Sequence, residues 1–180
     1  MNWTINRVVF VALALGCLLL NGCGIYSFNG ATIDYNTTKT ISITNLYNDT
    51  PNGPANLSQR FTEKLRDYFQ QNTNLLIVNE EGDLQLDGKI VSYETQDVAP
   101  TTAINPDQTD LSSITKLTIT LQCTYQNVND DEFDFENKSF SFFANFNNTQ
   151  NALADVEQEL IEEISDQIII DIFNATVANW

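Results

Sequence analysis

Strict alternation of apolar and polar residues over Leu117–Tyr125 is the feature that most constrains the fold of this chain. Successive side chains of a β-strand point to opposite faces, so this period of two predicts a strand with one buried face and one solvated face. Such a strand needs neighbouring strands and a covering layer on its apolar side. The apolar positions are Leu117, Ile119, Leu121, Cys123 and Tyr125, and the polar positions are Thr118, Thr120, Gln122 and Thr124.

Four further segments are predicted to form strands. Tyr35–Tyr47 alternates in its centre and is rich in β-branched residues, and Leu75–Val78 has the composition of a short buried strand. Leu84–Thr95 and the aromatic segment Phe133–Phe146 complete the set. Gly88 lies inside the third of these segments, and because glycine weakens a regular strand it predicts a bulge or a bend there.

Two segments have the periodicity of amphipathic helices, about Ala55–Gln71 and about Asn151–Asn174. Acidic residues crowd the first turns of the second helix, where the helix dipole favours negative charge. Charged residues recur on every turn of that helix, so we expect it to pack on a core rather than enter a membrane. The apolar stripes are Leu57, Phe61, Leu65, Tyr68 and Phe69 in the first helix, and Leu153, Val156, Leu160, Ile161, Ile164, Ile168, Ile172 and Phe173 in the second.

The order of these elements predicts an α+β fold. We expect a two-layer sandwich, with a mostly antiparallel or mixed sheet of about four strands and both amphipathic helices on one face. The polar segment Gln96–Lys116 is predicted to be a long loop, either mobile or used for contact. Phe140, Phe142 and Phe143 place aromatic side chains on both faces of the last strand, which predicts that part of the uncovered face meets a partner.

The amino-terminal residues have the pattern of an export signal. Arg7 precedes Val8–Leu20, an apolar run of signal length that is shorter than a membrane-spanning helix. The next residues, Leu20–Cys23, resemble a bacterial lipobox, in which the cysteine sulfur receives a diacylglyceryl group and the chain is cleaved just before it. We therefore expect Cys23 to be lipidated and to anchor the protein in a membrane through acyl chains. Cys17 is the competing acceptor.

Composition excludes several classes of function. The chain has 24 acidic and 8 basic residues and a net charge of −16, so it repels nucleic-acid phosphates. It has no histidine, the commonest general base and metal ligand. We expect no catalytic residue, no metal site and no cofactor. Cys123 is predicted to be a small core residue, and Asn129–Glu132 an ordinary turn, since it lacks the ligand spacing of an EF-hand loop.

Three of the basic residues lie close together in the first predicted helix: Arg60, Lys64 and Arg66. One interpretation is a solvated helix face, on which Glu63 and Asp67 are the local partners of these cations. The other is a small patch that contacts an anion. Both interpretations are open at this point.

Three stretches of the chain resemble the LptE family of lipopolysaccharide-assembly lipoproteins, particularly its short, divergent forms. They are Leu20–Phe28 just after the signal, the strand, turn and helix of Ile41–Phe69, and Gln167–Asn174 near the carboxyl terminus. The resemblance extends over most of the chain after the signal, and none of its motifs is catalytic. Cys23 is the residue that it carries over directly.

The resemblance implies a division of the chain into a signal peptide (1–22), a lipidated tether (23–30) and one LptE-like α+β domain (31–180). It also implies an outer-membrane lipoprotein that plugs the lumen of the LptD β-barrel, assists the assembly of that barrel and handles lipopolysaccharide at the last export step. The domain is then expected in the periplasm or in the barrel lumen. The competing interpretation is an extracytoplasmic lipoprotein that binds another protein or ligand.

Overall fold

The structure is a computed structural model that describes residues 33–98 and 114–178. The predicted signal peptide, the lipidation site Cys23 and the tether lie outside the described residues, as does most of the predicted loop. In chain order the elements are β1 (Thr40–Ile43), β2 (Tyr47–Asn48), α2 (Leu57–Asn72), β3 (Leu76–Val78), β4 (Leu84–Val98), β5 (Ile114–Asn127), β6 (Phe135–Asn147) and α3 (Leu153–Thr176).

The six strands form one mixed sheet, in which five follow the order β3-β1-β4-β5-β6. β4, β5 and β6 are long antiparallel neighbours, while β1 is parallel to both β3 and β4. The two-residue β2 pairs with β4 farther along the same side. Helix α2 makes the crossover that the parallel pairing of β1 and β3 requires.

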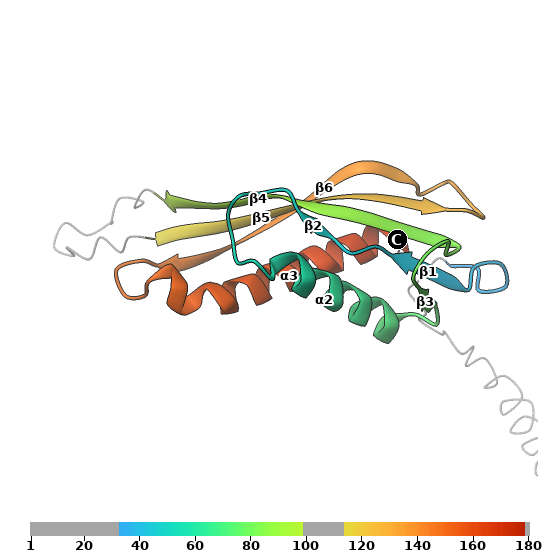
Figure 1. Ribbon diagram of the computed structural model, residues 1–180, viewed down its shortest axis with the longest axis horizontal. Coiled ribbons are helices and arrows are strands. Elements are labelled where there is room, and N and C mark those ends of the chain that lie inside the picture. The colour runs from blue at the N-terminus through green and yellow to red at the C-terminus, as the bar shows by residue number, and fades with distance from the viewer. Residues whose placement is uncertain (1–32, 99–113, 179–180) are drawn as a thin grey trace, which may run out of the picture.

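Both helices cover the same face of the sheet, and the described residues place no layer on the opposite face (Figure 1). The core lies between the sheet and the helices, where the odd-numbered side chains of β5 meet the apolar stripes of α2 and α3. Phe173 of α3 joins the two helices, because its ring packs edge-on against Tyr68 at 5.1 Å and against Phe69 at 5.2 Å between centroids.

The predicted fold class is confirmed, although the sheet has six strands rather than about four. The first predicted strand splits into the short β1 and β2. The loop predicted over Gln96–Lys116 is wrong at both ends, because Gln96 pairs with Lys116 and Val98 with Ile114 at the end of the β4–β5 ladder. The polar side chains of these strand ends resemble those of a loop, so the sequence did not indicate the pairing. In the structure the buried Thr115 hydroxyl is paired, because it donates to the Asp97 carboxylate at 2.7 Å.

The bulge in β4 does not lie at Gly88. The register shifts between Ile90 and Ser92, whereas Gly88 pairs regularly with Cys123. A Cβ atom at Gly88 would lie 2.8 Å from Leu46 Cδ2 and 2.9 Å from Cys123 Sγ. Close packing of the Leu46 side chain, rather than a bend in the strand, therefore requires glycine at this position.

Cys123 is confirmed as a core residue, with 1% of its surface exposed. Burial raises the pKa of its thiol to about 12, so the thiol keeps its proton at neutral pH. The acidic segment Asn129–Glu132 lies in the turn between β5 and β6, as predicted. Neither described helix combines the length and the apolar character needed to cross a membrane.

Candidate functional site

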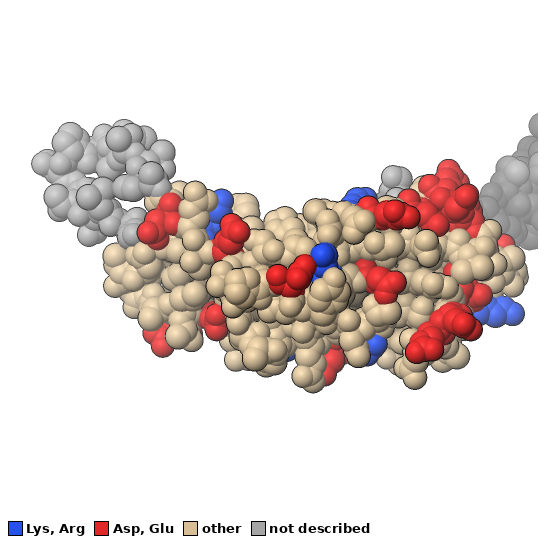
Figure 2. All heavy atoms as spheres, turned by 45° about the horizontal axis from the view of Figure 1, so that its top comes forward, with Lys and Arg blue, Asp and Glu red and all other residues tan. Residues whose placement is uncertain are grey.

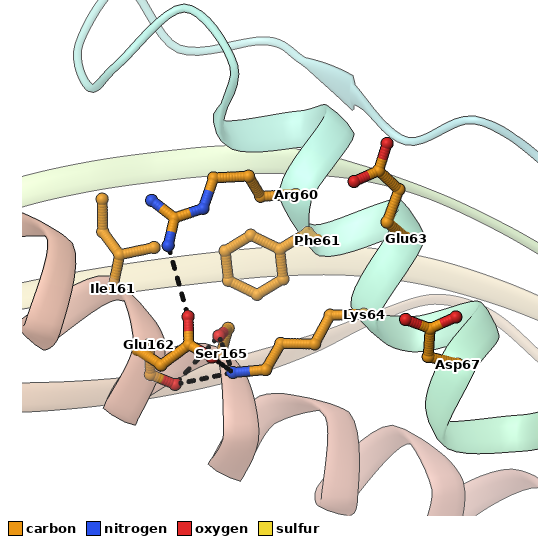
Figure 3. A pocket seen from close by; sticks show the side chains of 8 residues that line it. All are labelled: Arg60, Phe61, Glu63, Lys64, Asp67, Ile161, Glu162 and Ser165. Atoms are coloured by element: carbon orange, nitrogen blue, oxygen red, sulfur yellow. Dashed lines mark hydrogen bonds and ion pairs between the residues drawn. The ribbon is translucent and has the colours of Figure 1, made fainter. Parts of the chain in front are cut away.

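Two of the three clustered cations face α3 across the groove between the helices (Figure 3). Lys64 Nζ lies 2.7 Å from Glu162 Oε1 and 2.7 Å from Asp166 Oδ1. Arg60 Nη2 lies 3.2 Å from Glu162 Oε2. Lys64 also donates to the Ser165 hydroxyl at 3.1 Å. The two cations therefore bind the acidic face of α3 and hold the helices together.

Arg66 does not join this cluster. Its Nη2 and Nε atoms both donate to the backbone carbonyl of Ile43, at 2.6 and 3.2 Å. A neighbouring side chain fixes the same loop, since the Thr62 hydroxyl accepts the backbone N–H of Leu46 at 3.0 Å. Arg66 thus binds the last residue of β1 rather than adding charge to the groove.

The groove between the helices is a pocket of about 210 Å³ in which carboxylates outnumber cations. Glu63 and Asp67 line it from α2, the helix of Arg60 and Lys64, whereas Glu162 faces these two cations from α3. The hydrogen bond from Lys64, followed by the charges of Lys64 and Arg60, lowers the pKa of Glu162, so this carboxylate is ionised at neutral pH. An anion entering the groove has to displace Glu162 from both cations.

The uncovered face of the sheet, here called the open face, is a larger candidate surface. The β4–β5–β6 register places polar, uncharged side chains side by side across it, in rows such as Ser92–Thr120–Ser141. The hydroxyls of Thr120 and Ser141 hydrogen-bond across two strands at 2.9 Å. The uncharged polar side chains of the open face include Gln85, Ser92, Gln96, Thr118, Thr120, Gln122, Thr124, Gln126, Ser139, Ser141 and Asn145.

Charge on the open face is balanced. Over β4 and β5 it carries Asp87, Glu94, Lys89 and Lys116, two acidic and two basic side chains. By contrast, α3 on the covered side carries seven carboxylates and no cation. Figure 2 shows few charged side chains over the middle of the molecule and a gathering of Asp and Glu toward its right end. Over β4 and β5 the open face is therefore neutral, on a chain with a net charge of −16.

Exposed apolar side chains interrupt this polar surface. Of the six large hydrophobic side chains that are exposed in the described part of the chain, five share the open face, as the strand register shows. Phe143 is one of them and is 47% exposed, with Lys116 Nζ 5.2 Å from its ring centroid. The five are Tyr47, Leu76, Val98, Ile114 and Phe143.

The aromatic pattern predicted for the last strand is confirmed. Phe140 and Phe142 turn toward the core, where Phe140 is 6% exposed, while Phe143 faces outward on the opposite side. The open face also holds a shallow pocket of about 350 Å³ between β2, β4 and β5. Lys89 lies on its edge, 3.0 Å from Asp49 Oδ2 and 5.9 Å from the Tyr47 ring centroid. The individual hydrophobic residues at this surface, other than Phe143, carried no signal in the sequence.

Several solved structures are similar to this chain in fold. A minor lipoprotein from Acinetobacter baumannii is 14% identical, with a TM-score of 0.45, and the match covers 75% of this chain and 89% of that one. A hypothetical protein from Chlamydia trachomatis is 8% identical, with a TM-score of 0.48 and coverage of 76% and 97%. A protein from Xanthomonas campestris is 11% identical, with a TM-score of 0.47 and coverage of 75% and 81%. No curated protein matches the chain.

The family assignment rests on a separate comparison. The family model described as LptE, lipopolysaccharide-assembly, matches residues 38–176. That span begins just before β1 and ends at the last residue of α3, so it contains the sheet, both helices and the open face. The chain belongs to the LptE lipopolysaccharide-assembly family.

Proposed function

We propose that this protein is an outer-membrane lipoprotein that plugs the lumen of an LptD-like β-barrel and assists its assembly for lipopolysaccharide export. Membership of the LptE family supports this proposal. The role needs a rigid domain with a surface suited to contact inside a barrel, and no chemical step.

The open face is the observation that carries the proposal. The interior of an outer-membrane barrel is polar, unlike the lipid-facing outside of its wall. A nearly neutral face of Thr, Ser, Gln and Asn side chains offers hydrogen-bond donors and acceptors to such a wall without burying unpaired charges. Phe143 and Ile114 add apolar contacts within this polar surface.

Lipidation of Cys23 is the second part of the proposal. A diacylglyceryl group on Cys23 gives membrane anchoring without a spanning helix. The short stretch of residues between Cys23 and β1 keeps the domain near the membrane surface, next to a barrel in the same membrane. Replacement of Cys23 by Ser tests how much of the association with the barrel depends on the anchor.

Direct contact with lipopolysaccharide through Arg60, Lys64 and Arg66 remains a prediction. A phosphate at Arg60 and Lys64 has to replace Glu162, and Arg66 has to leave the Ile43 carbonyl. Glu162→Gln removes the carboxylate that both groove cations share, while Lys64 keeps Asp166, and provides the test. If the groove contacts phosphate, this variant binds lipopolysaccharide more tightly than wild type; unchanged binding counts against the contact.

The experiment that tests the plug role is purification of the tagged full-length protein from outer membranes in mild detergent. Wild type is expected to bring down a large β-barrel protein at near-equal stoichiometry. Thr120→Arg places a bulky charge in the middle of the open face and is expected to abolish this recovery. Gln158→Arg, on an exposed position of α3, adds the same side chain to the covered side and is the matched control.

Recovery of the protein without any barrel contradicts the plug role and favours the alternative, a lipoprotein that binds another protein or ligand. Recovery of the barrel by both variants contradicts the assignment of the contact to the open face. Thermal unfolding of each variant separates loss of contact from loss of folding.

A further inference from the structure

A pocket of about 580 Å³ lies at the end of the domain, between the segment before β1, the end of β5, the β5–β6 turn and the last turn of α3. It is separate from the groove between the helices and from the open face, and the proposed function makes no use of it. We call it the end pocket. It is lined by Ile33, Asp34, Thr37, Thr38, Tyr125, Asn127, Asn129, Asp130, Glu132, Phe133, Thr176 and Val177.

The charge of its walls is negative. Asp34, Asp130 and Glu132 line the pocket, and none of the lining residues is Lys or Arg. One oxygen of Asp34 accepts the backbone N–H of Asn36 at 2.9 Å, and one oxygen of Asp130 accepts that of Glu132 at 3.1 Å. The Thr37 side chain also hydrogen-bonds to the Asp34 carboxylate, whereas the described residues place no donor on the second oxygen of Asp130. The last turn of α3 adds the negative end of a helix dipole.

Tyr125 gives an observation independent of this charge. Only 2% of its surface is exposed, it lines the end pocket, and its hydroxyl has no hydrogen-bond partner in the part of the chain that the structure describes. No buried side-chain oxygen or nitrogen of the described residues lacks a partner, so this unpaired hydroxyl oxygen is accessible, and a ligand in the pocket can bond to it. Burial, followed by the charges of Asp134 and Asp130, raises the pKa of Tyr125, so its hydroxyl stays neutral.

The wall also has an apolar and aromatic part. Ile33, Phe133 and Val177 line the pocket beside the Tyr125 ring, which packs against Phe135 at 5.7 Å between centroids. Within the described residues no three acidic or Cys side chains are arranged to hold a metal ion. A bare metal ion also leaves most of this volume and its apolar wall unused. The chemistry that fits both the acidic and the apolar part of the wall is a positive group on a short apolar stem.

We propose that the end pocket binds an organic cation, a guanidinium or ammonium group on a short aliphatic stem. The cationic group binds the carboxylates of Asp34 and Asp130 and donates to the Tyr125 hydroxyl oxygen. The stem packs against Ile33, Phe133 and Val177. This chemistry is found both in a small free amine and in the Arg or Lys side chain of a polypeptide.

Calorimetric titration of the full-length protein in detergent with butylguanidinium tests the site. Butylurea has nearly the same shape without the charge and is the matched probe. Saturable binding of butylguanidinium and no binding of butylurea are expected. Absence of saturable binding of butylguanidinium, or equal binding of the two probes, overturns the proposal.

Two variants assign the binding to the pocket. Tyr125→Phe removes only the hydroxyl and is expected to weaken binding of butylguanidinium about tenfold, the effect of one hydrogen bond to a charged group. Asp130→Asn is expected to weaken it at least as much. Asp171→Asn, which removes a charge from α3 outside the pocket, is expected to leave the affinity unchanged. Equal weakening by Asp171→Asn and Asp130→Asn means attraction to the acidic chain in general and overturns the site.

Tyr125→Phe keeps the ring and its packing, so its fold is checked by near-ultraviolet circular dichroism, and unchanged affinity in this folded variant also overturns the site. The arginine-containing peptide acetyl-Gly-Arg-Gly-amide then identifies the source. Tighter binding of the peptide than of butylguanidinium assigns the pocket to a polypeptide side chain, and weaker binding assigns it to a free amine. None of these measurements involves a barrel, so their outcome is independent of the plug role.

Discussion

The two faces of the sheet are made by the same strands and differ in almost every property. On β5, the side chains of Leu117, Ile119 and Leu121 are buried beneath the helices, while Thr118 and Thr120 between them remain partly exposed. A strand with period two can thus supply half of a core and half of a polar surface. The covered face specifies the fold, and the open face is left for contact.

The helical side and the open face also differ in their charge. The seven carboxylates of α3 lie on the helical layer, whereas acidic and basic side chains balance on β4 and β5 of the open face. The high negative charge of the chain keeps the helical side solvated and repels partners of the same charge. It does not prevent a close fit on the other side.

The largest expected difference in unfolding free energy is between the alanine variants of two phenylalanines. Phe69→Ala empties a core position that is 0% exposed and is expected to lower the free energy of unfolding by about 3–5 kcal/mol. Phe143→Ala removes the same ring from the open face and is expected to cost less than about 1 kcal/mol. Urea unfolding measures both values, and equal losses contradict the separation of the two faces.

Gly88 gives the next largest effect. Gly88→Ala pushes a methyl group against Leu46 and Cys123 on the covered side, which is expected to cost about 1–3 kcal/mol. Lys89→Ala, one residue along β4, changes only the open face and is expected to cost much less than Gly88→Ala. Thermal unfolding of the two variants decides the comparison; a stable Gly88→Ala protein means that Leu46 moves aside easily.

Two lysines sharpen the comparison further. Lys64 joins Glu162 and Asp166 across the helices, so Lys64→Ala is expected to cost about 1 kcal/mol in unfolding free energy. Lys116 on the open face lies over the Phe143 ring, and Lys116→Ala is expected to cost about 0.5 kcal/mol. Salt screens charges, so the cost of Lys64→Ala falls at 1 M NaCl. A cost that does not change with salt argues against an ionic contribution.

The smallest effect is a pH dependence at Asp83, where β4 begins. Its Oδ2 accepts hydrogen bonds from the backbone N–H groups of Lys39 and Thr40 and from the Thr40 hydroxyl, which lowers its pKa below the ordinary 3.8. Its stabilising contribution is therefore present above about pH 4 and is lost as pH falls through the lower folded value. Urea unfolding between pH 3 and 5 is expected to depend less on pH in Asp83→Asn than in wild type. Asp87→Asn on the open face is the control, and identical profiles for wild type and Asp83→Asn contradict the role of Asp83.

The sequence predicted the covered face better than the open one. The alternation at Leu117–Tyr125 and the stripe from Leu57 to Phe69 predicted the α+β fold, because burial selects apolar residues at regular spacing. The extension of the hairpin through Gln96 and Lys116 was missed, since solvated strand ends carry polar side chains that resemble a loop. Pairing there depends on the register between β4 and β5, which the residues of one strand alone do not determine.

The candidate sites differ in the same way. The cluster of Arg60, Lys64 and Arg66 was visible in the sequence, but its partners were not, because Glu162 and Asp166 come from a helix about a hundred residues later. The end pocket likewise combines Asp34, Tyr125 and Asp130 from distant segments. Only the folded chain brings such residues together.

Site-specific photo-crosslinking in intact outer membranes tests the central claim, that the open face contacts a barrel. A photoreactive residue is placed at Thr118 or Ser141 on the open face, and at Gln158 or Glu163 on α3. The account predicts that the two open-face positions crosslink to a large β-barrel protein and that the two helix positions do not. Crosslinks to the barrel from α3 alone, or none from either open-face position, would contradict it.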